Sequence, residues 1–100
     1  MKKGHENSKQ NPAAFYALVR GRVQGVGFRY STIQEAQQLR IKGWVRNTIA
    51  GDVEVWAEGP KEKLALLIKW LHQGPQLSRV DSLDIEDRNP VGYNDFDIKH

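Results

Sequence analysis

The amino-acid sequence predicts one α+β domain in which two helices cover one face of an antiparallel sheet. Two observations carry this prediction. Segments with the apolar pattern of strands and segments with the apolar spacing of helices follow one another in the order βαββαβ, and a short strand ends the chain. The chain has 100 residues, the length of one domain, and 39% of them are hydrophobic and 27% charged, as in globular proteins.

The first half of the chain opens with a tail, a strand and a turn. Residues 1–12 are polar and lack periodicity, so we expect a mobile tail there and the domain over residues 13–100. Phe15–Val23 is rich in apolar and β-compatible residues and predicts a strand. A short turn with two glycines follows at residues 24–27.

A helix is expected after this turn. The segment up to Arg40 contains neither glycine nor proline, and its apolar residues recur at three-residue spacing. These apolar residues are Ile33, Ala36 and Leu39. The segment predicts a helix of about three turns that ends near Gly43.

The next segments predict a hairpin and a second helix. Residues 43–48 read as a strand, residues 50–52 supply a hairpin turn, and residues 53–58 alternate between apolar and other side chains, as in a half-buried strand. A helix starts at Gly59-Pro60, because proline is tolerated in a first turn. Its core-facing stripe consists of Leu64, Leu67, Ile68 and Leu71.

Two further strands complete the order. Gly74-Pro75 stops the second helix, Val80–Glu86 predicts a fourth strand, and Phe96 and Ile98 predict a short last one. A βαββαβ order with two helices on one face of an antiparallel sheet is the ferredoxin-like arrangement, also called the α/β plait.

Composition excludes several classes of function. The chain has no cysteine, which excludes disulfides, thiolate metal sites and cysteine nucleophiles. No apolar run approaches the roughly 20 residues that span a bilayer, so we expect a cytoplasmic protein with no membrane partner. Residues 1–50 hold nine Lys and Arg against two Asp and Glu, whereas residues 51–100 hold six against ten. The basic first half suggests an anionic ligand.

The turn after the first strand has the features of an anion site. Its glycines let the backbone fold tightly, and the amides of a helix N-terminus attract negative charge. Arg29 follows at the helix start, where a cation opposes the helix dipole but can bind two phosphate oxygens. Two nucleotide motifs are absent, because no lysine follows the glycines and Tyr30 occupies the place of a third glycine. The turn therefore predicts a cradle the size of a phosphate group.

The residues of this turn and of the second strand resemble the acylphosphatase family. The resemblance rests on residues 21–29, GRVQGVGFR, and on residues 43–48, GWVRNT. It covers about residues 14–100 and includes Glu58-Gly59-Pro60 and the last strand. It implies the hydrolysis of acyl phosphates to a carboxylate and inorganic phosphate, and it implies a ferredoxin-like fold.

The resemblance also implies roles for individual residues. Arg29 corresponds to the phosphate-binding arginine, Asn47 to the asparagine that positions the attacking water, and Thr48 to a supporting neighbour. From the residues alone, an asparagine at a strand end is more often a turn residue. The resemblance further implies that the phosphate is bound by Arg29 and by a cradle of backbone amides, which belong to Gln24, Gly25, Val26, Gly27 and Phe28.

Such a reaction needs neither a cofactor nor a metal ion. The leaving carboxylate has a pKa of roughly 4 and hardly requires a general acid. His5, His72 and His100 are scattered and form no metal-spaced set. We therefore expect a metal-independent monomer that acts on a small acyl phosphate, is inhibited competitively by its product phosphate, and binds no nucleic acid.

One alternative comes from another class of protein, the RNA-binding modules of ferredoxin-like fold. These modules carry aromatic residues on the open face of the sheet. Lys42-Gly43-Trp44 begins like one of their motifs, but Arg46 and Thr48 stand where further aromatic residues should follow. Partly buried packing is the simpler expectation for Trp44 and the other tryptophans.

Overall fold

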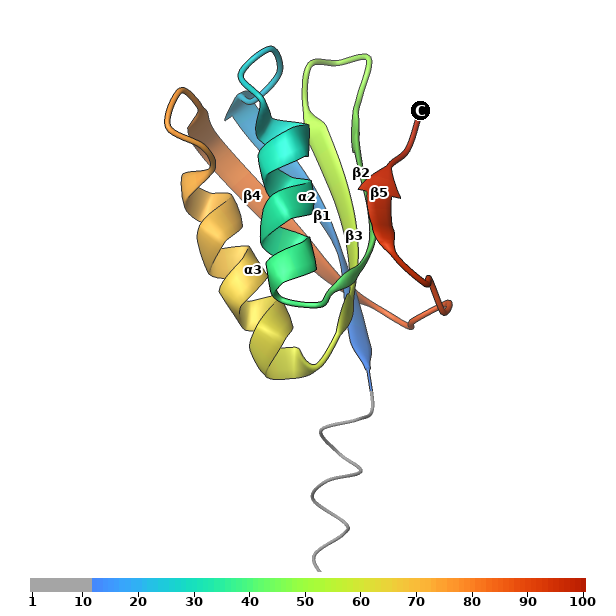
Figure 1. Cartoon of the computed structure of the whole chain (residues 1–100). Coiled ribbons are helices and arrows are strands. Elements are labelled where there is room, and N and C mark those ends of the chain that lie inside the picture. The colour runs from blue at the N-terminus through green and yellow to red at the C-terminus, as the bar shows by residue number, and fades with distance from the viewer. Residues whose placement is uncertain (1–11) are drawn as a thin grey trace, which may run out of the picture.

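Two helices lie across one face of a five-stranded sheet in the computed structural model, which describes residues 12–100 (Figure 1). The elements are β1 (Ala13–Arg22), α2 (Phe28–Gln38), β2 (Lys42–Asn47), β3 (Val53–Gly59), α3 (Lys61–Gln73), β4 (Arg79–Arg88) and β5 (Phe96–Ile98). This order confirms the predicted ferredoxin-like class. The tail predicted over residues 1–12 lies, apart from Pro12, outside the described residues.

The sheet has the strand order β4-β1-β3-β2-β5 and is mixed, whereas the sequence analysis expected an antiparallel sheet. The pairs β1–β3, β1–β4 and β2–β3 are antiparallel, but β5 pairs with β2 in parallel. The cause is the direction of the chain. It reverses after β4 and returns along the opposite edge of the sheet, where β2 already runs the same way.

The core lies between the helices and the sheet, and alternation along the strands builds it. Every second side chain of β1 and β3 points to the helices, because side chains of a strand alternate between its two faces. The buried residues of these two strands include Phe15, Ala17, Val19, Val53, Val55 and Ala57. The stripe of α3 covers them as predicted, with Leu64, Leu67 and Leu71 buried and Ile68 packed at the margin.

Helix α2 differs from its prediction in its buried face and in its end. The fully buried residues are Phe28, Thr32 and Ala36, while Ile33 and Leu39 only pack against the edge of the core. Thr32 fits there because its hydroxyl donates a hydrogen bond of 2.7 Å to the carbonyl oxygen of Phe28. The row that faces the sheet therefore starts at the first residue of the helix and continues at every fourth position.

The sequence predicts that α2 ends near Gly43, but the helix ends earlier. The helix stops at Gln38, and Arg40 turns the chain with a φ of 61°. Gly43 lies inside β2, where a Cβ atom would sit 1.8 Å from the carbonyl oxygen of Trp56. This glycine therefore permits a close approach of two strands. Neither described helix is long and apolar enough to cross a membrane.

A buried carboxylate holds the connection between β4 and β5 against the sheet. Glu58 on β3 is 4% exposed, and its oxygens accept hydrogen bonds from Trp56 Nε1 and from the backbone N–H groups of residues 91–93. Burial raises the pKa of the Glu58 carboxyl, but these hydrogen bonds outweigh it and lower the pKa below its ordinary value. The carboxylate thus fixes the path of the chain into β5.

Candidate active site

A small hollow of about 160 Å³ lies where β1 leads into α2 and where β2 ends. It brings together side chains from three separate parts of the chain. The lining residues are Val23, Gly25, Gly27, Phe28, Arg29, Tyr30, Asn47 and Ile98. Arg29 and Asn47, which the sequence analysis assigned to binding and to catalysis, therefore share one cavity.

The backbone of the loop is shaped by two glycines. Gly25 and Gly27 have φ angles of 76° and 78°, which other residues rarely adopt. A Cβ atom on either would meet nothing within 4 Å, so the backbone conformation alone requires glycine at these positions. Left-handed φ angles turn the chain sharply, and the loop passes directly into the first turn of α2.

The N-terminus of α2 is free to attract an anion. Gly27 is its N-cap residue and offers no side-chain cap, and its first turn contains no acidic residue. The first amides of a helix have no partner within the helix, and the helix dipole places partial positive charge on them. The hollow therefore lies beside donors that suit the oxygens of a phosphate group.

Arg29 adds a full positive charge that no carboxylate neutralises within residues 12–100. The arginines that do form ion pairs in this part of the chain are Arg20, Arg46, Arg79 and Arg88. Arg29 is half-buried, and neither a carboxylate nor an imidazole lines the hollow. The electrostatic character of the hollow is therefore that of an anion site.

Asn47 lines the same hollow and carries a hydrogen-bond acceptor that no described residue uses. Its Oδ1 atom is buried and has no partner among the described residues. Leaving such an atom unsatisfied costs about 1–3 kcal/mol, so buried acceptors are nearly always paired with protein or water. The chemistry of this position suits a water molecule that donates a hydrogen bond to Oδ1.

Three residues that the sequence analysis placed at the site do not line the hollow: Gln24, Val26 and Thr48. The side chain of Val26 packs against the core. The Nε2 group of Gln24 donates hydrogen bonds to the carbonyl oxygens of Thr48 and Asp52, and the Thr48 hydroxyl accepts one from the Asp52 N–H. The side chains of Gln24 and Thr48 thus act on the β2–β3 hairpin, next to the hollow.

Val23, Tyr30 and Ile98 line the hollow and were missed as site residues. Tyr30 follows Arg29 directly in the first helical turn, and this adjacency in the sequence was a usable signal. Its side chain is 66% exposed. Val23 closes the end of the first predicted strand. Ile98 gave no signal in the sequence, because it reaches the hollow only through the parallel pairing of β5 with β2.

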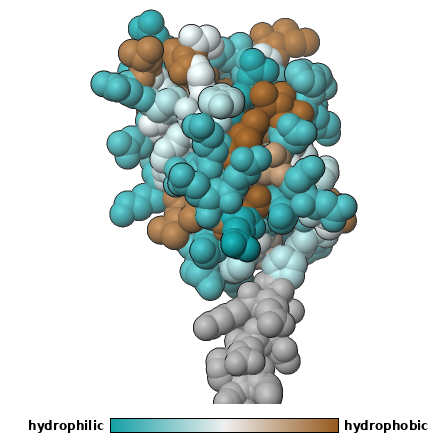
Figure 2. Space-filling model, in the orientation of Figure 1, coloured by the Kyte–Doolittle hydropathy of each residue, from teal (hydrophilic) through white to brown (hydrophobic). Residues whose placement is uncertain are grey.

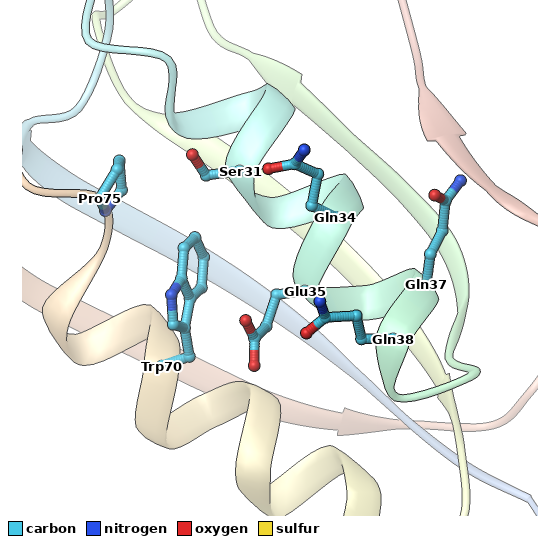
Figure 3. Close-up of a pocket in the computed structure, with 7 residues that line it drawn as sticks. All are labelled: Ser31, Gln34, Glu35, Gln37, Gln38, Trp70 and Pro75. Carbon is cyan, nitrogen blue, oxygen red and sulfur yellow. The ribbon is translucent and has the colours of Figure 1, made fainter.

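A larger groove of about 630 Å³ lies between α2 and α3. Figure 3 shows Trp70 of α3 on one side of it and Gln34, Glu35 and Gln38 of α2 on the other. No residue of the predicted site lines this groove, and its charged side chain is the carboxylate of Glu35, which repels anions. The smaller hollow is therefore the candidate site.

The face of the molecule that carries the helices is mostly polar. Figure 2 shows it covered mainly by hydrophilic side chains, with hydrophobic ones scattered among them. Among residues 12–100, no group of three His, Cys, Asp or Glu side chains could hold a metal ion.

The open face of the sheet carries aromatic residues, and both acidic and basic side chains contact them. Tyr16 and Trp44 are the register partners of Trp56 on either side, and all three are half-buried, as expected for the tryptophans. The Tyr16 hydroxyl donates to Glu54, and Trp56 Nε1 donates to Glu58. Burial and the bond to Glu54 raise the pKa of Tyr16 to about 12. Arg46 and Lys99 lie over the ring of Trp44, and Arg88 lies over that of Tyr16. Carboxylates and cations are thus mixed among these rings, and this face lacks the uniformly basic character that would favour RNA binding.

Comparison with known proteins finds that the sequence and the fold are similar to those of one family. The family model described as Acylphosphatase matches residues 15–98. The acylphosphatase of Geobacter sulfurreducens is 42% identical over 83 residues, which are 82% of this chain and 91% of that protein. The acylphosphatase of Thermococcus kodakarensis is 47% identical over 78 residues, which are 78% of this chain and 86% of that protein.

Solved structures agree with these relatives. An acylphosphatase from Coxiella burnetii superposes with a TM-score of 0.86 at 33% identity and covers 99% of this chain and 100% of its own. An acylphosphatase from Bacillus subtilis gives the same TM-score at 36% identity and covers 88% of this chain and 99% of its own.

Proposed function

The chain belongs to the acylphosphatase family, and from this premise we propose which of its residues carry the hydrolysis of acyl phosphates. The loop amides and Arg29 bind the phosphoryl group, and Asn47 orients the water that attacks it. One observation carries the proposal: Arg29 lines a single hollow of about 160 Å³ together with Asn47, whose buried Oδ1 has no partner among the described residues.

The phosphoryl group is the part of the substrate that fits this hollow. The hollow has the volume of about five water molecules at roughly 30 Å³ each, which is the scale of a phosphorus atom and its oxygens. Arg29 can donate two parallel hydrogen bonds to these oxygens, and the first amides of α2 can donate more. The developing charge of phosphoryl transfer is thereby met by donors that are already in place.

Asn47 serves the attacking water. A water hydrogen donates to Oδ1, and the oxygen lone pair of the water then faces the phosphorus atom held by Arg29. The water oxygen forms the new bond to phosphorus, the bond from phosphorus to the acyl oxygen breaks, and its electron pair leaves with the carboxylate. The water proton passes to the phosphate product or to solvent.

The leaving group explains why so few groups suffice. A carboxylate with a pKa near 4 departs without a proton, so no acid has to line the hollow. A phosphate monoester releases a far more basic alkoxide and needs such an acid. Acyl phosphates are therefore expected to be much better substrates than monoesters.

Further expectations concern the product, the assembly and the location of the protein. Inorganic phosphate presents the same oxygens as the substrate and is expected to inhibit competitively. All the residues of the proposed site come from one chain, so the proposal needs no second copy, and we keep the predictions of a monomer and of a cytoplasmic location.

One assay tests the proposal. Hydrolysis of acetyl phosphate is compared with that of p-nitrophenyl phosphate, each with and without a metal chelator. We expect rapid, chelator-insensitive release of phosphate from the acyl phosphate and little from the monoester. Equal rates on both substrates, or loss of turnover with the chelator, would contradict the proposed mechanism.

A further inference from the structure

The side chain of Gln24 directly joins two parts of the site that the sheet connects only through β3. Its Nε2 group donates one hydrogen bond of 2.9 Å to the carbonyl oxygen of Thr48 and one of 2.8 Å to that of Asp52. Both amide hydrogens are therefore used. The two acceptors flank the turn of the β2–β3 hairpin, and Gln24 itself begins the loop that leads to α2.

No strand ladder could make this connection. The loop extends from β1 and Asn47 ends β2, but β3 lies between these two strands in the sheet. Strands that are separated by a third lie about 10 Å apart, which is beyond any backbone hydrogen bond. Figure 1 shows the loop and the hairpin at the same end of the sheet, and the side chain of Gln24 spans from one to the other.

The hairpin turn that Gln24 holds is itself closed. The Thr48 N–H donates 2.9 Å to the Asp52 carbonyl oxygen, and the Asp52 N–H donates 3.0 Å to the Thr48 hydroxyl. The Gly51 N–H donates to the Thr48 carbonyl oxygen as well. A turn with these bonds moves as one unit, and Asn47 is the residue that immediately precedes it. Asn47 pairs with Val53 at the last position of the β2–β3 ladder, so this ladder and the bonds of Gln24 to the turn together set its place relative to the loop.

We propose that Gln24 is a positioning residue that sets the place of Asn47 relative to the phosphate loop. This inference rests on the proposed function. The glycines, the helix N-terminus and Arg29 do not depend on the side chain of Gln24, so phosphate binding is retained without it. The alignment of the attacking water is lost, because a misplacement on the order of 1 Å can slow a reaction by about 10²-fold.

The test separates turnover from phosphate binding. Gln24→Met keeps the length of the side chain but removes both donors, and Gln37→Met makes the same exchange at an exposed position of α2. We expect kcat of Gln24→Met on acetyl phosphate to fall by about 10- to 100-fold, with the Ki of inorganic phosphate changed less than about twofold. Gln37→Met is expected to match the wild type in both. Gln24→Asn, which keeps the amide but shortens its reach, replaces the Met variant if that one does not fold.

A double-mutant cycle shows whether Gln24 acts through Asn47. In an Asn47→Ala background, Gln24→Met is expected to lower kcat by less than about twofold, since the residue that it positions is gone. Three outcomes would each overturn the positioning role. The first is independent effects of the two substitutions in the double mutant, and the second is full kcat in Gln24→Met. The third is a Ki of phosphate that rises in Gln24→Met as much as kcat falls. Turnover of acetyl phosphate by the wild type tests the proposed function separately.

Discussion

Arg29 in the first turn of α2 and Asn47 at the end of β2 line one hollow, although β1 and β2 are not neighbours in the sheet. One residue brings a charge without a carboxylate partner, and the other brings a buried oxygen without a hydrogen-bond partner, both within residues 12–100. A phosphoryl group and a water molecule would complete both. Substitution of Arg29 and of Asn47, one at a time, tests this arrangement.

Arg29→Ala should lower kcat/KM for acetyl phosphate by on the order of 10²–10³-fold, because the charge on the phosphoryl oxygens loses its main counterpart. Arg29→Lys should recover little, since an ammonium group cannot bind two oxygens in parallel. Steady-state kinetics and the Ki of phosphate measure both effects.

Arg22→Ala is the matched control for Arg29, because it removes an exposed arginine from the end of β1 and thus the same charge. We expect less than about a threefold change there, from weaker steering alone. Equal losses in Arg22→Ala and Arg29→Ala would reduce the role of Arg29 to general electrostatics.

Asn47→Ala should lower kcat by on the order of 10²–10³-fold and leave the Ki of phosphate nearly unchanged, because the amide contacts the water and not the bound anion. Removing the unpartnered Oδ1 also relieves an unsatisfied buried atom, so the melting temperature should not fall greatly. Asn89→Ala, at an exposed position after β4, controls for the exchange. Retention of near-full kcat in Asn47→Ala would remove this residue from the mechanism.

Gly27→Ala tests the shape of the loop apart from its charge. The φ of 78° costs an alanine about 1–2 kcal/mol, and no neighbouring atom is close enough to clash. We expect the free energy of unfolding in urea to fall by about this amount and the Ki of phosphate to rise, because the anion is bound more weakly. Gly27→Asn is the control, since asparagine tolerates this conformation better. An alanine variant as stable as the asparagine variant would contradict the left-handed loop.

Most of the fold could be predicted because its signals are local. The stripe of α3 and the alternation of β3 are periodicities that a short window of sequence displays. The parallel pairing of β5 could not be read in this way, because it depends on which edge of the sheet the chain reaches after β4. Ile98 was missed as a site residue for the same reason.

The candidate site, too, could be predicted only where its signals are local in the sequence. Glycines beside an arginine predicted the anion cradle, because loop and helix start are adjacent in the chain. The direction of the Gln24 side chain could not be predicted, since its two acceptors belong to a hairpin more than twenty residues away. The sequence placed Gln24 in the cradle, and the structure shows its side chain bonded to the hairpin.

The last prediction concerns the carboxylate that holds the approach to β5. Because the pKa of Glu58 is lowered in the folded protein, its contribution to stability is complete above the ordinary value of 4.5 and is lost as the pH falls through the lower folded value. Glu54, whose pKa burial raises but hydrogen bonds from Tyr16 and Arg46 lower overall, acts in the same direction. The protein should therefore become less stable below about pH 4.5.

Glu58→Gln should lower the free energy of unfolding at pH 7 by about 1–3 kcal/mol, because the backbone amides of residues 91–93 lose a charged acceptor. The difference from the wild type should shrink as the pH falls below 4.5 and through the lower folded pKa of Glu58, because the wild-type carboxyl then becomes neutral as well. Urea unfolding at several pH values measures both curves, with Glu86→Gln on the exposed face of β4 as the control. A gap that stays constant from pH 7 down to the lowest pH at which the wild type still folds would show that the charge of Glu58 does not hold this segment.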